Sequence, residues 1–193
     1  MTVSNAGRPN QREHILDIAL GLIAQHGASK MSMRQLAKEC GLNVAAIYHY
    51  FESKDALVKA VVDERQYGAR MADIPELDSA LSPEDRLTAV FTTIWDGAIA
   101  EEPVWRLLLG EGLRGEPAVM SVGKDLLDTI QPALADWISS TIPELESPDH
   151  VAALVTGQMF AGFMRHIFEP DLDTGIIGKE QGHSLCAAVF GTR

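Results

Sequence analysis

Residues 32–57 read SMRQLAKECGLNVAAIYHYFESKDAL and contain the pattern that decides the fold of the first part of the chain. Ser32 followed by Gln35 matches a capping box, so a short helix is predicted from Ser32 to about residue 39. Gly41 then permits a tight turn, because glycine tolerates a positive φ. A second short helix is predicted over residues 44–50. Two helices joined by a glycine-containing turn are the layout of a helix-turn-helix.

A helix as short as 44–50 is not stable alone, because nucleation is costly and few hydrogen bonds follow it. Neighbouring elements must therefore hold it. The apolar residues of 10–26 repeat at helical spacing, and Gly27 is placed to end that helix. We expect this helix to complete a three-helix core with the residues Ile15, Ala19, Leu22, Leu36, Ala37, Leu42 and Ile47. Tyr50 and Phe51 are also expected to lie in that core.

Helix signals continue to the end of the chain, and no alternating apolar run predicts a sheet. Ser53 begins a helix expected to reach about Met71, with Pro75 as its stop. A loosened joint is expected at three glycines, Gly110, Gly112 and Gly115, and a kink or irregular turn at Pro132. The remaining helices are predicted near 82–100, 103–110, 117–140, 148–168 and 175–190. The predicted fold class is all-α with about nine helices.

The net charge of −11 is unevenly distributed. Residues 1–70 carry nine Lys and Arg against seven Asp and Glu, or +2, whereas residues 71–193 carry seven against twenty, or −13. This division permits a DNA-facing head on an acidic body. We predict a helix-turn-helix DNA-binding domain over 1–55 and a helical effector-binding and dimerisation domain over 56–193, linked by the helix of about 53–71.

The second short helix carries two kinds of side chain. Val44, Ala45 and Ala46 are small, so the helix can lie deep in a major groove and contact thymine methyl groups. Tyr48 and His49 can reach phosphates or base edges, although His49 suits an exposed surface position equally well.

Two basic residues flank this helix. Arg34 has the geometry for a bidentate contact with guanine. Lys54, near the start of the next helix, is either a phosphate contact or a solvated lysine.

Residues 10–60 resemble the TetR family of transcriptional regulators. The resemblance is carried by the runs 15–19, 32–37, 41–42 and 47–57, and Tyr48-His49-Tyr50-Phe51 followed by Ser53-Lys54 is its most specific part. It implies a homodimer, and a C-terminal effector pocket whose occupancy moves the connecting helix and releases DNA. The predicted DNA contacts are Ser32, Arg34, Asn43, Val44, Ala45, Ala46, Tyr48, His49 and Lys54.

Aromatic and Met side chains concentrate in the second part of the chain, where they form either a core or the wall of an apolar pocket. A pocket of this composition predicts an apolar or aromatic small-molecule effector. The predicted ligand contacts are Phe91, Trp95, Trp105, Met120, Leu127, Phe160 and Met164.

Small residues recur at every fourth position on the last two predicted helices. Ala153, Gly157 and Ala161 form one such stripe, and Gly178, Gly182 and Cys186 form the other. Small residues on one face let helices approach closely. The stripes therefore predict either a four-helix seam between two copies of the chain or tight packing inside one protomer.

Residues 82–190 contain no nucleophile elbow, phosphate loop or paired Cys/His motif, so no enzyme activity, metal or cofactor is expected. His166, Glu169, Asp171 and Asp173 are better explained as a solvated acidic helix end than as a cation site. Two widely separated cysteines and no long apolar run predict a cytoplasmic protein without a membrane partner.

The leading functional prediction is a repressor that leaves its operator when an effector binds. Two recognition helices in a dimer must meet successive major grooves roughly 34–36 Å apart, which predicts a pseudo-palindromic double-stranded DNA operator. The alternatives are an effector-independent or activating regulator of the same type, and a helical small-molecule-binding protein or enzyme without DNA binding.

Overall fold

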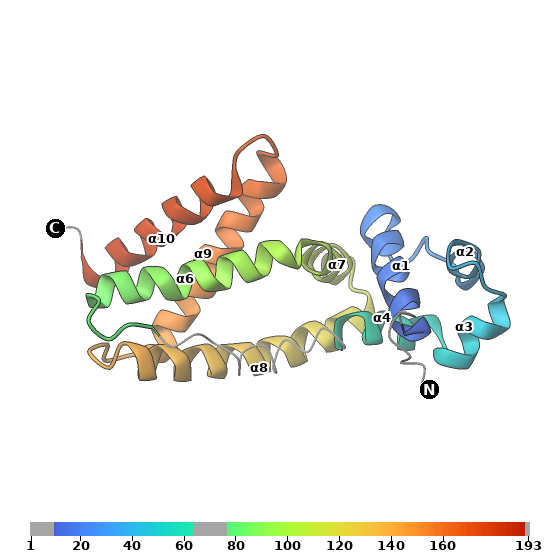
Figure 1. Cartoon of the computed structure of the whole chain (residues 1–193), viewed down its shortest axis with the longest axis horizontal. Coiled ribbons are helices and arrows are strands. Elements are labelled where there is room, and N and C mark those ends of the chain that lie inside the picture. The colour runs from blue at the N-terminus through green and yellow to red at the C-terminus, as the bar shows by residue number, and fades with distance from the viewer. Residues whose placement is uncertain (1–9, 64–76, 192–193) are drawn as a thin grey trace, which may run out of the picture. The chain divides into compact units, whose positions relative to one another are not determined.

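The computed structural model describes residues 10–63 and 77–191, which form nine helices and no strand (Figure 1). The predicted all-α class is confirmed for these residues. The chain divides into two compact units, one of residues 1–66 with 102–125 and the other of residues 67–101 with 126–193. Helix α8 (Pro117–Thr141) contributes to both units.

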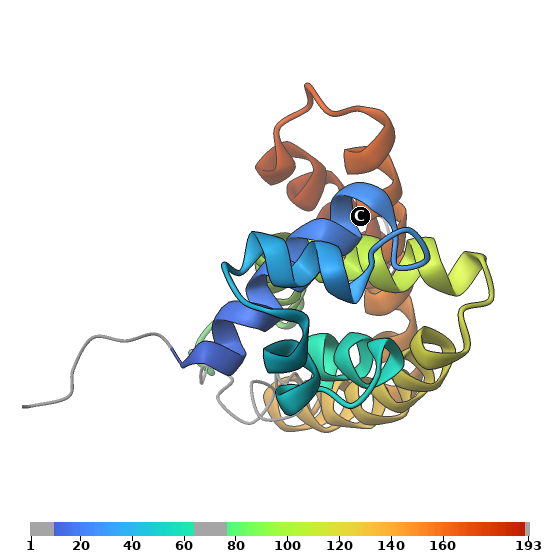
Figure 2. The same ribbon diagram turned by 90° about the vertical axis from the view of Figure 1, so that its right-hand side faces the viewer.

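The first unit contains α1 (Gln11–His26), α2 (Met33–Glu39), α3 (Val44–Tyr50), α4 (Lys54–Asp63) and α7 (Glu102–Leu113). Helix α1 packs against α2, α4 and α7, and α2 packs against α3 (Figure 2). The expected core is confirmed except for Leu22 and Leu42, which are only half-buried, and Tyr50, which is exposed. Other buried side chains of this unit include Leu16, Leu20, Ile23, Met31, Met33, Leu57, Val58, Val61 and Val62.

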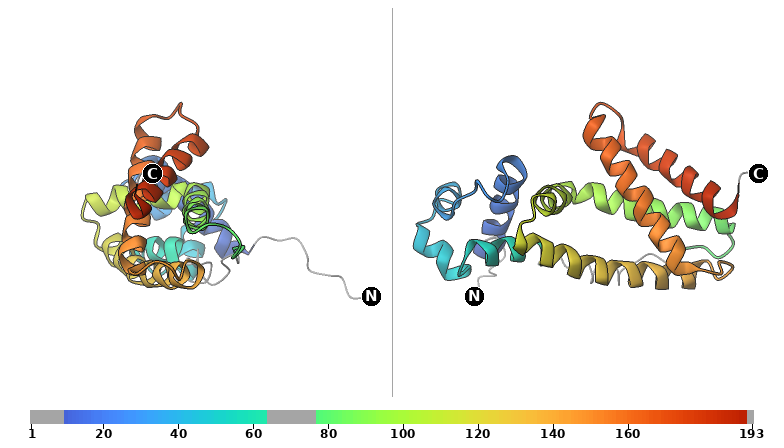
Figure 3. Two further views of the ribbon diagram at one scale, coloured as in Figure 1. Left: turned by 90° about the vertical axis from the view of Figure 1, so that its left-hand side faces the viewer. Right: turned by 180° about the vertical axis from the view of Figure 1, so that it is seen from behind.

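The second unit is built on α6 (Pro83–Ala100), α9 (Pro148–Phe168) and α10 (Thr174–Phe190). Helix α10 packs against both α9 and α6, and α9 and α10 run antiparallel as a hairpin (Figure 3). The fully buried side chains here include Leu87, Val90, Phe91, Leu134, Ile138, Val155, Ile177 and Leu185.

Side chains cap several helices at the positions that the sequence indicates. Ser32 Oγ accepts from the backbone N–H of Gln35 at 3.1 Å, and Ser53 Oγ accepts from that of Ala56 at 3.0 Å. Each bond satisfies a donor that the first turn of a helix leaves unpaired. Ser147 also precedes a helix, but its side chain makes no capping bond.

Two expectations about irregular backbone hold only in part. Gly110 and Gly112 lie inside α7, which continues to Leu113, and the chain turns at Gly115 with φ +74°. No irregular turn occurs at Pro132, where α8 is unbroken, and the alternative of a kink stays a prediction. Proline has no N–H, so the carbonyl of Asp128, four residues earlier, lacks its helical hydrogen bond. Asp128 and Pro132 are both exposed, so water can bond that carbonyl instead. The expected end of α4 near Met71 and the stop at Pro75 lie outside the described residues.

Among residues 10–63 and 77–191, α9 alone is long and apolar enough to cross a membrane by length and composition. One such helix is weak evidence for a membrane-spanning segment, because a core helix of a soluble protein has the same length and composition.

Candidate DNA-binding surface

The turn between α2 and α3 is closed by backbone hydrogen bonds. The N–H of Gly41 donates to the carbonyl of Lys38 at 3.1 Å, and that of Leu42 donates to the carbonyl of Ala37 at 2.8 Å. Gly41 has φ +67°, a conformation that favours glycine. Asn43 then caps α3, its Oδ1 accepting from the N–H of Ala46 at 2.8 Å. One tight, hydrogen-bonded turn therefore fixes how α3 follows α2.

Helix α3 is anchored to the core through one fully buried residue, Ile47. Ala45, Tyr48 and His49 are exposed, and half of the Tyr48 surface is open to solvent. Val44 and Ala46 are half-buried. A helix that buries one residue and exposes most of the others is available to a large partner such as a duplex.

The other predicted contacts lie on the elements beside α3. Arg34 is exposed on α2, and Ser32 and Asn43 are exposed at the starts of α2 and α3. The capping bonds occupy an oxygen of Ser32 and of Asn43, so the Asn43 side-chain amide remains its available donor. All predicted DNA contacts except Lys54 thus lie on the helix-turn-helix itself.

Lys54 lies at the start of α4 and is half-buried. Its Nζ donates to the backbone carbonyl of Ser29 at 3.2 Å, in the turn between α1 and α2. The ammonium group therefore connects α4 to that turn, a role that the sequence did not indicate. Its remaining N–H donors can still face a phosphate.

The same turn is held from its other side by α7. Glu111 Oε1 accepts from the backbone N–H of Ala28 at 3.1 Å and pairs with Arg114 Nη1 at 2.8 Å. Only 2% of the Glu111 surface is exposed. Gly27 has φ +87°, and a Cβ at that position would lie 3.1 Å from Glu111 Oε1. A side chain 83 positions along the chain thus meets the turn that leads into α2.

Phe51 is buried, as expected, with the Arg12 guanidinium 4.9 Å from the centroid of its ring. The expectation that Tyr50 lies in the core is wrong, because 38% of its surface is exposed and its ring meets His49 edge-on. Tyr50 is the last residue of α3, so no further turn of that helix follows to cover its ring.

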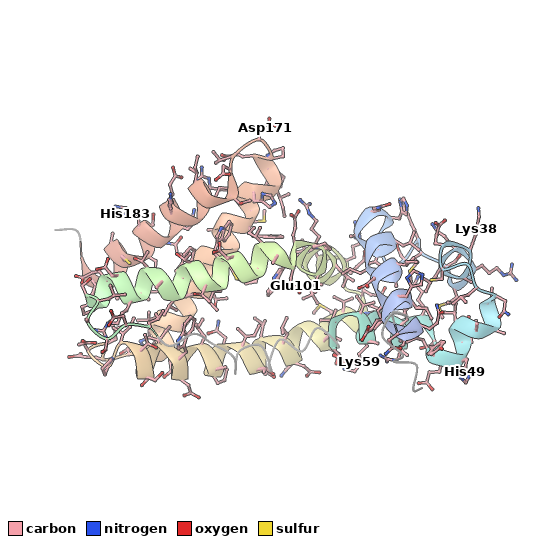
Figure 4. The ribbon with its side chains drawn as sticks, viewed as in Figure 1. Lys38, His49, Lys59, Glu101, Asp171 and His183 are labelled. Carbon is pink, nitrogen blue, oxygen red and sulfur yellow. The ribbon has the colours of Figure 1, made fainter. Side chains whose placement is uncertain are left out.

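Sequence reasoning also missed Lys38, an exposed cation in the last turn of α2. Figure 4 shows Lys38 and His49 at the surface of this helix pair. A lysine in the middle of the motif was the available signal.

Comparison with known proteins agrees with this geometry. Residues 15–61 match the family model described as bacterial regulatory proteins, tetR family. The chain is 26% identical over 152 residues to the HTH-type transcriptional regulator BetI of Agrobacterium fabrum, an alignment that covers 77% of this chain and 71% of BetI.

This chain belongs to the TetR family. It is a helix-turn-helix transcriptional regulator, and its relatives BetI of Agrobacterium fabrum and UidR of Escherichia coli carry that same description.

Two solved structures with the same fold carry ligands. FadR of Bacillus subtilis in complex with stearoyl-CoA has a TM-score of 0.67 at 19% identity, covering 94% of this chain and 99% of that one. A regulator from Saccharomonospora viridis in complex with choline has a TM-score of 0.69 at 17% identity, covering 89% and 93%. At these identities the likeness shows the fold of the TetR family alone.

The predicted effector contacts of this TetR-family chain are divided between the two units. Trp105 and Met120 belong to the first unit, and Phe91, Trp95, Leu127, Phe160 and Met164 belong to the second. Met120, Leu127 and Met164 are exposed, and Trp105 and Phe160 are half-buried. Phe91 and Trp95 are buried and stacked, with ring centroids 6.4 Å apart.

The buried position of Trp95 is explained by glycines on the neighbouring helices. A Cβ on Gly162 of α9 would lie 2.7 Å from the Trp95 ring, and one on Gly178 of α10 would lie 2.6 Å from it. Trp95 Nε1 also donates to the carbonyl of Thr174 at 3.0 Å. Trp95 thus fills a space that only glycine leaves open, which is a core role.

The predicted dimer residues behave differently on the two helices. On α9, Ala153, Gly157 and Ala161 are all exposed and form a continuous stripe. On α10, Gly178 and Gly182 are buried against α6, with a Cβ on Gly182 3.3 Å from Phe91. Packing inside one protomer therefore accounts for the two α10 glycines.

A groove of about 510 Å³ runs between α6 and α10. Its walls include Thr88, Thr92, His183 and Cys186, and Figure 4 shows His183 on the outside of α10. Thr88 Oγ1 lies 3.3 Å from Cys186 Sγ. Burial raises the pKa of the Cys186 thiol, and it raises that of the half-buried Cys40 as well. Both thiols are free.

The described ranges contain no group of three or more His, Cys, Asp or Glu side chains that could hold a metal ion. In the acidic segment that follows α9, Glu169 instead pairs with Arg165 at 3.3 Å.

Proposed function

We propose that this chain is a cytoplasmic, homodimeric repressor that binds a pseudo-palindromic operator through α3 and leaves it when a small apolar molecule binds residues 56–193. The observation that carries the proposal is the exposure of Ala45, Tyr48 and His49 on a helix anchored by Ile47. A buried α3 would have left no surface for a major groove.

In this proposal residues 1–55 read the operator. Ala45 and the neighbouring small residues contact thymine methyl groups, and Arg34 contacts a guanine. Tyr48, His49 and Lys54 bind phosphates and set the register. Lys38 and Tyr50, which the structure adds as exposed neighbours, are further candidates for phosphate contacts.

Dimerisation is proposed to occur through the outer face of α9. The stripe of Ala153, Gly157 and Ala161 is flanked by the apolar side chain of Leu154, which is 44% exposed. A small-residue stripe with an apolar margin suits close packing against a second helix. A second copy of the same helix would cover this surface.

The effector is proposed to be apolar or aromatic. Met120, Leu127 and Met164 expose large flexible or branched apolar side chains that no neighbour in their own unit covers fully. Met surfaces adapt to ligands of different shape. The stearoyl-CoA and choline complexes of the two structural relatives support a small-molecule effector without indicating its identity.

Selection of bound duplexes from a random DNA pool by the full-length protein tests the proposal. We expect an inverted repeat whose half-sites are centred about 10 base pairs, or a multiple of that, apart. The proposal would be overturned if the selected duplexes bound no more tightly than the starting random pool. It would also be overturned if the enriched site lacked two-fold symmetry.

The effector step is tested with a panel of hydrophobic compounds. At least one should raise the melting temperature and weaken operator binding. Arg34→Ala is the control, because it should keep the melting shift while losing operator affinity. A panel that leaves both quantities unchanged would contradict an apolar effector.

A further inference from the structure

We infer that Glu111 of α7 is a positioning residue for DNA binding, holding the turn between α1 and α2 in the arrangement that presents the helix-turn-helix. The inference rests on the proposed operator binding and adds a residue outside the domain to which DNA contacts are assigned. Residues 102–125 belong to the same compact unit as residues 1–66.

Side chains from other helices bond the backbone of two successive residues in the turn of residues 27–31. Its Ala28 N–H donates to Glu111, and its Ser29 carbonyl accepts from Lys54. Gly27 begins the turn with a positive φ, and Met31 ends it as a buried side chain. Ser32, the cap of α2, follows directly. The direction in which α2 leaves α1 is therefore set by bonds from α7 and α4.

Glu111 is suited to this role because it is charged and almost fully buried. A buried carboxylate is costly unless it is paired and bonded, so its geometry is tightly specified. Arg114 supplies the ion pair, and the Ala28 N–H supplies a charge-assisted bond. Gly27 leaves room for the carboxylate, since a Cβ there would lie 3.1 Å from Oε1.

Loss of the bond between Glu111 and Ala28 should lower operator affinity by changing the conformation of the protein before it binds DNA. If the turn samples several arrangements, only the fraction in the native one can place α2 and α3 on the operator. The apparent dissociation constant rises in inverse proportion to that fraction. Non-specific binding depends on phosphate charge rather than on register, so it should change little.

The test compares three variants of the full chain on a duplex selected by the wild type. Glu111→Ala removes both bonds, and Glu111→Gln keeps an acceptor for the Ala28 N–H. Glu102→Gln is the matched control, because it removes a negative charge and an i,i+4 ion pair with Arg106 from the same helix. Hydrogen exchange at the Ala28 amide reports the bond directly.

We expect Glu111→Ala to weaken operator binding about tenfold, to change binding to random DNA less than twofold, and to speed exchange at Ala28. Glu111→Gln should retain operator affinity to within about threefold, and Glu102→Gln to within about twofold. If Glu111→Ala failed to fold, Glu111→Gln would still test the role: exchange faster at Ala28 without loss of operator affinity would overturn it.

Two further outcomes would overturn the inference. One is a Glu111→Ala variant that binds the operator as tightly as Glu102→Gln. The other is an equal loss on operator and random DNA, which would indicate general damage rather than positioning. A wild type that selects no operator would instead refute the proposed function.

Discussion

The ring of Trp95 occupies the space that a side chain on Gly178 would need, because a Cβ on Gly178 would lie 2.6 Å from the Trp95 ring. Trp95 comes from α6 and Gly178 from α10. Their contact joins two helices that are far apart in the sequence, and it makes the close packing of α6 and α10 depend on a missing methyl group.

Gly178→Ala should therefore destabilise the protein. Overpacking costs about 1–3 kcal/mol and outweighs the roughly 1 kcal/mol that alanine adds to helix propensity. Gly97→Ala is the control, because a Cβ on Gly97 of α6 would have no atom within 4 Å, so alanine should give a small gain in stability. Chemical denaturation measures both, and a Gly178→Ala variant as stable as Gly97→Ala would contradict the packing argument.

Gly157→Leu should convert the proposed homodimer into a folded monomer. Gly157 is exposed in a single chain and has no atom within 4 Å of a Cβ position, so leucine disturbs only what packs on it from outside. Light scattering gives the mass, and circular dichroism checks that the helices remain. Gly97→Leu on α6 is the control and should stay dimeric. An intact Gly157→Leu dimer would place the seam elsewhere.

Lys54→Ala should weaken binding to all sequences and reduce the slope of log affinity against log salt by about 1, as expected for one phosphate contact. Lys59→Ala is the control, since Lys59 is paired with Asp63 at 2.8 Å and should leave the slope unchanged. An unchanged slope in Lys54→Ala would leave Lys54 only the bond to Ser29.

Acid should remove a stabilising contact between α6 and the segment that follows α8. Arg86, only 5% exposed, donates to the carbonyl of Thr141 at 2.5 Å and to Glu144 Oε1 at 2.6 Å. The hydrogen bond from Arg86 lowers the pKa of Glu144 below its ordinary value of 4.5. A carboxyl whose pKa is lower in the folded state stabilises the protein above the unfolded pKa, and this contribution is lost as pH falls through the folded pKa.

Glu144→Gln should therefore reduce the free energy of unfolding at pH 7, and the difference from wild type should shrink as the pH falls below about 4.5. Denaturant titrations at several pH values measure it. Glu146→Gln, a neighbouring exposed carboxylate, is the control. A difference that stays constant with pH would show that the pair does not couple to protonation.

Much of the helix-turn-helix could be predicted from the sequence because its signals are local. The Ser32 cap and the turn at Gly41 each depend on a few adjacent residues, and the structure has both. Tyr50 was misplaced because its exposure depends on where α3 ends and on which neighbours remain to cover it. Being next to the buried Phe51 in the sequence gave no information about whether Tyr50 is exposed.

The sequence by itself determined the helices, the helix-turn-helix and the apolar residue that anchors α3, since periodicity and capping are properties of short segments. The tertiary structure decided which partner each small or charged residue meets. Gly178 packs on Trp95 within one chain, and Glu111 bonds Ala28 across 83 positions. Such contacts depend on how helices are placed in space, and no local pattern in the chain encodes that placement.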